Sequence, residues 1–260
     1  MIRPPCILSD RTVIAVSGPE ARPFLQGLIT NDIANLTPEQ SLYAALLSPQ
    51  GKILFDFLLF AEAETVLIDC HKDVRVALQK RLSMYKLRAK IDIAARDDRV
   101  VIVDQGPYDP RLATLGQRSI VATGIETVDG TDAYHEWRWG LGVPEGLDFS
   151  AEKIFAMDGG LDELHAISFT KGCYVGQELT ARMKHRGTDR KRLLPVNAPD
   201  AELATGAPVT AGEIELGTMM SSYGDAGYAL IRLDRLAEAT APISVGGAEV
   251  SILKPDWLFT

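Results

Sequence analysis

The residues with the clearest capacity for chemistry lie in one short segment, KGCYVGQE, at residues 171–178. Cys173 directly follows Gly172 and comes two positions after Lys171. A nearby cation lowers the pKa of a thiol and increases the fraction of nucleophilic thiolate. Glycine leaves room for a ligand to approach the backbone, here at Gly172 and Gly176. These neighbours suit a functional thiol assisted by Lys171, but residue type alone favours an inert, small core cysteine.

The remaining cysteines show no metal-binding pattern. The chain has three cysteines, Cys6, Cys70 and Cys173, which are far apart and include no CxxC pair. An iron–sulfur cluster held by a single chain normally takes about four thiolates. We therefore predict no metal site within this chain.

Two further polar residues stand among apolar neighbours. Asp56 interrupts the apolar run at residues 53–60, and Arg138 lies among Tyr134, Trp137 and Trp139. A charged side chain in such a place either faces a ligand or turns to solvent. The sequence leaves both possibilities open for Asp56 and for Arg138.

A basic run follows the cysteine segment at residues 182–192, RMKHRGTDRKR, with six Lys or Arg and one Asp. Such a run suits a phosphate, an RNA, an acidic partner or a polyglutamate tail, or it is a solvated hinge. The chain as a whole carries a net charge of −8 with a pI of about 5.1. Because an acidic surface repels phosphates, we expect no direct nucleic-acid partner and no membrane partner.

Composition and length bound the class of protein. The chain has 260 residues, of which 46% are hydrophobic and 24% charged, as in ordinary globular proteins. No apolar stretch approaches the ~20 residues that a membrane-spanning helix needs. The first residues, MIRPPCILSD, lack the pattern of a secretory signal. We therefore predict a soluble, cytoplasmic protein.

Apolar periodicity indicates the elements that must position these side chains. Strands are expected at residues 12–17, 43–48, 53–60, 66–69 and 100–103, with helical spacing at 24–29 and 74–87. Residues 104–130 contain Gly-Pro and Asp-Pro pairs and are expected to be irregular. Short strands and turns follow residue 207 and are typical of a small β-barrel.

The segment KGCYVGQE resembles the signature of the folate-binding YgfZ family, which is related to the T-protein of the glycine cleavage system, an aminomethyltransferase. Eukaryotic relatives of the YgfZ family work in mitochondrial iron–sulfur assembly. Further segments resemble both groups in the same order along most of the chain: GPEARPFLQGLITNDI, LLSPQGKILFDFLL and GTMMSSYGDAGYALIRLD.

This resemblance implies a site for tetrahydrofolate. Asp56 falls where T-proteins carry a catalytic acid; they have two consecutive acids there, and this chain has Phe55 before Asp56. The site residues that we predict are the catalytic group of Cys173, Lys171 and Asp56, and the folate-binding group of Asp56, Arg138, Tyr134, Arg11, Gln177 and Glu178.

The resemblance also implies a function. We predict a tetrahydrofolate-binding accessory protein for the assembly or repair of iron–sulfur enzymes, among them tRNA-modifying enzymes, with folate and iron–sulfur client or assembly proteins as partners. One alternative is a folate-dependent aminomethyltransferase of the glycine-cleavage type, against which stand the missing first acid and the cysteine segment. Another is an RNA-binding module that uses residues 182–192.

The fold that the resemblance implies is α+β, like that of the T-protein, with a small C-terminal β-barrel. We predict three units. Residues 1–45 and 135–190 form a discontinuous N-terminal domain, residues 46–134 an inserted α+β domain, and residues 191–260 the barrel.

Overall fold

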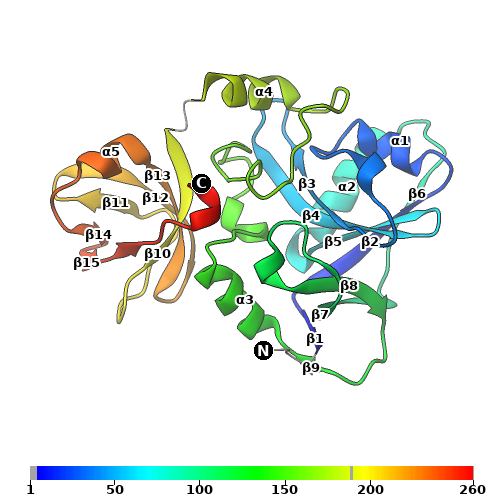
Figure 1. Ribbon diagram of the computed structural model, residues 1–260, viewed down its shortest axis with the longest axis horizontal. Helices are drawn as coiled ribbons and strands as arrows, with labels where there is room; N and C mark the ends of the chain where they lie inside the picture. Colours follow the sequence, from blue (N-terminus) through cyan, green and yellow to red (C-terminus); the bar gives the residue numbers. More distant parts are fainter. Residues whose placement is uncertain (1–4, 188–189, 260) are drawn as a thin grey trace.

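A five-stranded antiparallel sheet forms the centre of the larger part of the molecule in this computed structural model, which describes residues 5–187 and 190–259 (Figure 1). Its strand order is β3-β4-β5-β2-β6. The strands are β2 (Arg11–Ser17), β3 (Leu42–Leu47), β4 (Ile53–Glu62), β5 (Thr65–His71) and β6 (Asp92–Ala95). Both faces of this sheet are covered, so its strands are apolar almost throughout, as expected for strands without a solvent face.

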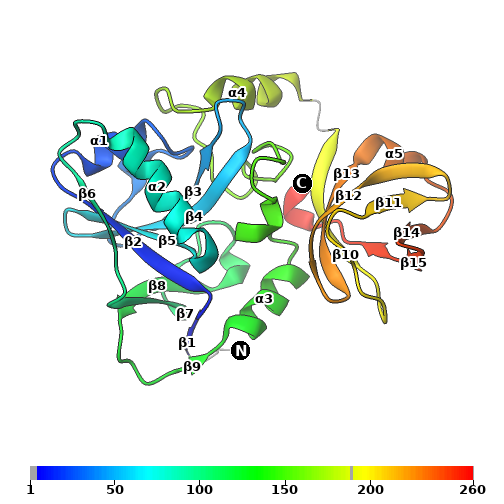
Figure 2. The ribbon, with the colours of Figure 1, turned by 180° about the vertical axis from the view of Figure 1, so that it is seen from behind.

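The alternate residues of β2 show which layers cover the two faces. Ile14 and Val16 pack on the side of α2 (Arg75–Lys86), whose Leu78 and Leu82 are fully buried there (Figure 2). Val13 packs on the opposite side, against a second sheet. Because successive side chains of a strand point to opposite faces, β2 contributes to both cores.

The second sheet has the order β8-β7-β1-β9. Its strands are β1 (Cys6–Ile7), β7 (Arg99–Tyr108), β8 (Gln117–Ala122) and β9 (Val128–Asp129). The expectation that residues 104–130 are irregular is wrong, since β7 extends to Tyr108 and β8 pairs with it. The Gly-Pro and Asp-Pro pairs between these strands indicated turns, and the short strand at residues 117–122 was therefore not predicted.

The remaining helices lie around these layers. They are α1 (Ala21–Gln26), α3 (Thr131–Gly140), α4 (Gln177–Arg186) and α5 (Leu233–Glu238), together with the 3₁₀ turns η1 (Ile33–Asn35), η2 (Lys72–Val74), η3 (Ala113–Leu115), η4 (Gly146–Phe149) and η5 (Asp256–Leu258). We call β1–β9 with α1–α4 the body. Among the described residues, no helix is long and apolar enough to span a bilayer.

The C-terminal strands form one seven-stranded sheet, β15-β14-β11-β12-β13-β10-β16. Its strands are β10 (Lys191–Asn197), β11 (Pro208–Ala211), β12 (Ile214–Tyr223), β13 (Ala226–Arg232), β14 (Ile243–Val245), β15 (Ala248–Glu249) and β16 (Ser251–Ile252). The two edge strands β15 and β16 are separated in sequence only by Val250. The sheet must therefore curl until its edges almost meet, and it forms the small barrel beside the body in Figure 1.

The predicted domain boundaries can be placed on this topology. The boundary at residues 45 and 46 falls inside β3, which pairs with β4 beyond it. The boundary at residues 134 and 135 falls inside α3. Strands on both sides of the first boundary share each sheet of the body. The division of the chain into three units stays a prediction.

Candidate functional site

Cys173 lies in an exposed loop, residues 168–176, that leads into α4; we call it the signature loop. Of the three cysteines, Cys173 is exposed, Cys6 is partly buried and Cys70 is buried. Burial raises the pKa of Cys70 to about 12, so that thiol stays protonated at neutral pH. Cys173 is therefore the thiol that a partner can reach.

Lys171 anchors the signature loop two residues before the cysteine. Its side chain is buried, and Nζ donates hydrogen bonds to the carbonyls of Ile29 at 2.8 Å and Asn31 at 2.7 Å. The ammonium group also lies 5.2 Å from the ring centre of Tyr174. Burial lowers the pKa of Lys171 to about 8. Its contacts are thus with the backbone of the body, and its predicted assistance to the ionisation of Cys173 stays a prediction.

The two glycines of the signature loop have different surroundings. Gly176 has a φ of +83°, and a Cβ there would lie 2.6 Å from the carbonyl oxygen of Ser48. A Cβ on Gly172 would meet nothing within 4 Å. Gly176 therefore lets the loop pack closely on the turn between β3 and β4, whereas Gly172 leaves the backbone beside the cysteine open.

Gln177 and Glu178 begin α4 directly after the loop. Gln177 is half-buried and Glu178 is exposed. Among the described residues, no hydrogen bond or ion pair joins either side chain to Asp56, Tyr134 or Arg138. The structure thus places them beside the cysteine loop and apart from the other predicted folate contacts.

Two other predicted site residues, Arg11 and Tyr134, meet in the centre of the body at Glu145. Its carboxylate accepts from Arg111 Nη1 at 2.5 Å, from Arg11 Nη1 at 3.2 Å and from the Tyr134 hydroxyl at 3.0 Å. Arg118 lies 3.5 Å away. Although burial alone would raise the pKa of Glu145, the surrounding arginines hold it well below its usual range.

Asp69 is the second centre of this cluster. It accepts from Arg11 Nε and from Arg118 Nε, each at 2.7 Å, and the three side chains are essentially inaccessible to solvent. Arg111 in turn pairs with Asp109 at 2.7 Å. We call these residues, with Glu145 and Tyr134, the central ion network. It connects the two sheets of the body, since it joins β2 and β5 to β8.

Asp56 lies at the edge of this network and faces inward. Its carboxylate accepts from the Tyr43 hydroxyl at 3.0 Å and from the backbone N–H of Gly146 at 2.9 Å. Burial raises the pKa of Asp56, although the charge of Arg11 opposes that shift. Of the two placements that the sequence left open, the solvent-facing one does not occur.

Arg138 connects the body to the barrel through Asp148. Arg138 Nη1 donates to Asp148 at 2.7 Å, and Nε donates to His135 Nδ1 at 2.8 Å. The same aspartate accepts from Ser221 at 2.8 Å and from Tyr223 at 3.0 Å, both on β12 of the barrel. The guanidinium is therefore held by partners within the protein, and its predicted contact with folate stays a prediction.

A folate-sized ligand does not fit these residues as one group. Tyr134 lines a cavity of about 640 Å³ on one side of α3, and Arg138 lines a separate cavity of about 440 Å³ on the other side. Asp56 and Arg11 line neither cavity, and their polar atoms are bonded inside the protein. A ligand that contacts all four must first break the central ion network, so we derive no chemical step from folate.

Sequence reasoning missed most of the central ion network, namely Asp69, Asp109, Arg111, Arg118 and Glu145. A signal was present in the strand TVLIDCH, where Asp69 interrupts an apolar run as Asp56 does in β4. The arginines that neutralise Asp69 come from distant parts of the chain, and nothing in the sequence pairs them with it.

The described residues were also expected to hold no metal site. Within residues 5–187 and 190–259, no cluster of three or more His, Cys, Asp or Glu has the geometry to hold a metal ion.

In the basic run, Arg182 and Arg186 are exposed on α4, whereas Arg192 is buried and pairs with Glu163 at 2.7 Å. Residues 188 and 189 of that run lie outside the described residues.

Comparisons with known proteins agree with this architecture. Residues 190–260 match the family model described as "CAF17, C-terminal beta-barrel domain". The chain is 32% identical to the human "Iron-sulfur cluster assembly factor IBA57, mitochondrial", over 96% of this chain and 84% of the relative, and equally identical to the mouse protein. A Neurospora crassa homologue is 34% identical, over 72% of this chain and 52% of the relative.

The fold resembles that of glycine cleavage system aminomethyltransferase T from Bartonella henselae. The TM-score is 0.74 at 17% identity, and the match covers 97% of this chain and 85% of that structure. The predicted α+β fold with a C-terminal barrel is confirmed. The relatives carry the IBA57 name, where the resemblance had indicated YgfZ. The prediction of a cytoplasmic protein, which the resemblance to YgfZ placed in bacteria, is wrong, because these relatives are mitochondrial.

Proposed function

Because this chain belongs to the family of the iron–sulfur cluster assembly factor IBA57, we propose that it acts in iron–sulfur cluster assembly, with Cys173 as the residue that contacts the cluster. The observation that carries this proposal is the exposure of Cys173 between two anchored positions of the signature loop, Lys171 before it and Gly176 after it. A thiolate is the usual protein ligand of an iron–sulfur cluster.

The number of available thiols defines the form of this contact. Only one of three cysteines is exposed, and a cluster normally takes about four thiolates. The chain therefore supplies one ligand, and the others come from a partner protein that carries the cluster. In this proposal the cluster is cargo shared between two proteins, and the rigid loop presents the sulfur at a fixed position.

The proposal assigns no role to tetrahydrofolate or to tRNA-modifying client enzymes. Both were expected from the resemblance. The tRNA-modifying clients stay a prediction, whereas the internal hydrogen bonds of Asp56 and Arg11 argue against a folate site in the native fold. The likeness to the aminomethyltransferase concerns the fold, because identity to that structure is 17%.

The proposal is tested by complementation in cells whose own IBA57 homologue has been deleted. The wild-type chain should restore the activity of cluster-containing enzymes, and Cys173→Ser should not restore it at equal protein level. Cys6→Ser, which removes a partly buried thiol, is the matched control and should restore activity. Full rescue by Cys173→Ser would show that the exposed thiol is not the cluster contact.

A further inference from the structure

A positively charged cavity lies where the barrel meets the body. It has a volume of about 290 Å³ and is lined by Lys153, Lys191, Arg232 and Arg235. Lys153 comes from the body, Lys191 begins β10, Arg232 ends β13 and Arg235 lies on α5. Four cations thus converge on one cavity in a chain whose net charge is −8.

Two of these cations stand directly opposite each other in the barrel sheet. In the antiparallel pair of β10 and β13, Lys191 is the register partner of Arg232. Like charges directly opposite destabilise an antiparallel pair. An anion bound between them would offset this repulsion.

The neighbouring carboxylates neutralise only part of the charge. Asp234 pairs with Arg232 at 2.7 Å, and Glu215 lines the same cavity. Within the described part of the chain, the side chains of Lys153 and Lys191 make no hydrogen bond or ion pair. Four cations and two carboxylates leave an excess of two positive charges.

We propose that this cavity binds the phosphate group of a small molecule. A phosphate monoester carries close to two negative charges at neutral pH, which matches the excess in the cavity, whereas a single carboxylate carries one. Its several oxygens accept hydrogen bonds from several donors at once, and here the four cationic side chains come from four different segments of the chain. The ammonium groups of Lys153 and Lys191 are the principal contacts, because the Nε and Nη2 donors of Arg232 already hold Asp234.

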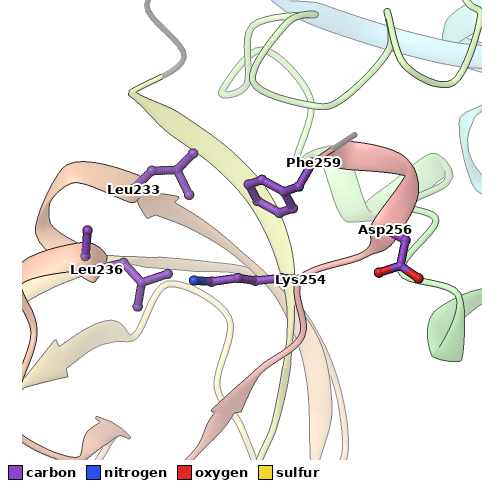
Figure 3. A pocket seen from close by; sticks show the side chains of 6 residues that line it. Leu233, Leu236, Lys254, Asp256 and Phe259 are labelled. Carbon is purple, nitrogen blue, oxygen red and sulfur yellow. The ribbon is translucent and has the colours of Figure 1, made fainter.

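The adjacent pocket of the barrel provides a contrast and a control. It is lined by Leu233, Leu236 and Phe259 with one cation, Lys254, and Figure 3 shows these side chains around a largely apolar hollow. Lys254 is exposed, as Lys191 is, and belongs to the same domain. Substitution of Lys254 changes the net charge by the same amount without touching the charged cavity.

The experiment is calorimetric titration of the full chain with pyrophosphate and with inorganic phosphate, against sodium chloride of equal ionic strength. We expect saturable binding to wild type and to Lys254→Gln, and a dissociation constant about tenfold higher for Lys191→Gln, since one charge-assisted contact is lost. Circular dichroism spectra of the variants check that each is folded.

Three results would overturn the proposal. If phosphate and pyrophosphate release no more heat than sodium chloride does, the cavity has no phosphate site. If Lys254→Gln and Lys191→Gln weaken pyrophosphate binding equally, the binding depends on the net charge of the protein and not on this cavity. Displacement of pyrophosphate by a single-stranded RNA oligonucleotide at physiological salt would assign the cavity to nucleic acid instead of a small molecule.

Discussion

Lys171 and Cys173 are two positions apart in the same loop, yet Lys171 is 7% exposed with its ammonium group on two backbone carbonyls, while Cys173 is exposed to solvent. The lysine thereby fixes the segment that presents the thiol. The buried ring of Tyr174, directly after the cysteine, fixes it on the other side. An exposed thiol between two buried neighbours is held in place without being covered.

Alkylation of the native protein should distinguish the three thiols. We expect iodoacetamide to modify Cys173 first, Cys6 more slowly, and Cys70 only after unfolding, because Cys70 is buried and burial raises its pKa to about 12. Peptide mass spectrometry after increasing reaction times measures this order. Modification of Cys70 before Cys173 would contradict the placement of the loop.

The two glycines of the signature loop should respond differently to alanine. We expect Gly176→Ala to lower the free energy of unfolding by about 1–3 kcal/mol, since its φ is +83° and the new Cβ meets the Ser48 carbonyl. Gly172→Ala is the matched control and should stay within about 0.5 kcal/mol of wild type. Urea denaturation of both variants measures the difference, and equal effects would refute the close packing at Gly176.

Lys171 should make stability depend on pH in the alkaline range. Its pKa of about 8 in the folded protein lies below the ordinary value of 10.5, so between these values the unfolded chain binds more protons than the folded one. The free energy of unfolding therefore rises with pH across that window. Plotted against pH, the free energy of unfolding of the wild type should rise relative to that of Lys171→Met, which lacks the titrating ammonium group. Parallel curves from pH 8 to pH 10 would rule out this contribution of Lys171.

Glu145 should be the most sensitive member of the central ion network. Glu145→Gln leaves three buried arginines, Arg11, Arg111 and Arg118, with only the carboxylates of Asp69 and Asp109. An excess charge buried in this way costs about 3–5 kcal/mol of stability. The exposed pair of Arg75 and Asp97 is the control, where Asp97→Asn should cost less than about 1 kcal/mol. Thermal unfolding followed by circular dichroism measures both, and similar losses would mean that the network contributes no more than a surface pair.

Tetrahydrofolate should bind poorly to the native protein. The polar atoms of Asp56 and Arg11 are bonded internally, and the cavities beside Tyr134 and Arg138 are separate. We expect that tetrahydrofolate up to about 1 mM, which corresponds to about 4 kcal/mol of binding free energy, leaves tryptophan emission unchanged. Trp137 and Trp139 line the two cavities and would report binding in either. A saturable change would mean that the central ion network opens for the ligand.

Local patterns in the sequence were enough to predict much of this protein. Alternation and apolar runs indicated β2 to β5, and helical spacing indicated α2. The resemblance of KGCYVGQE and the other segments implied the fold with its C-terminal barrel, which the comparisons confirm. The short strand β8 was missed, because six residues between turn signals carry little periodicity.

The tertiary structure alone decided how the charged residues are used. Asp56, Tyr134, Arg11 and Arg138 have the residue types of a ligand site, but after folding their polar atoms bond within the protein. Arg11 pairs with Asp69 and Arg138 with Asp148, while Asp56 accepts from Tyr43 and Tyr134 donates to Glu145. A buried charge persists when an opposite charge reaches it, and that depends on long-range packing. The same holds for Cys173. The sequence identified this cysteine, whereas the tertiary structure, which buries Lys171 and Tyr174 on either side of it, leaves its side chain exposed.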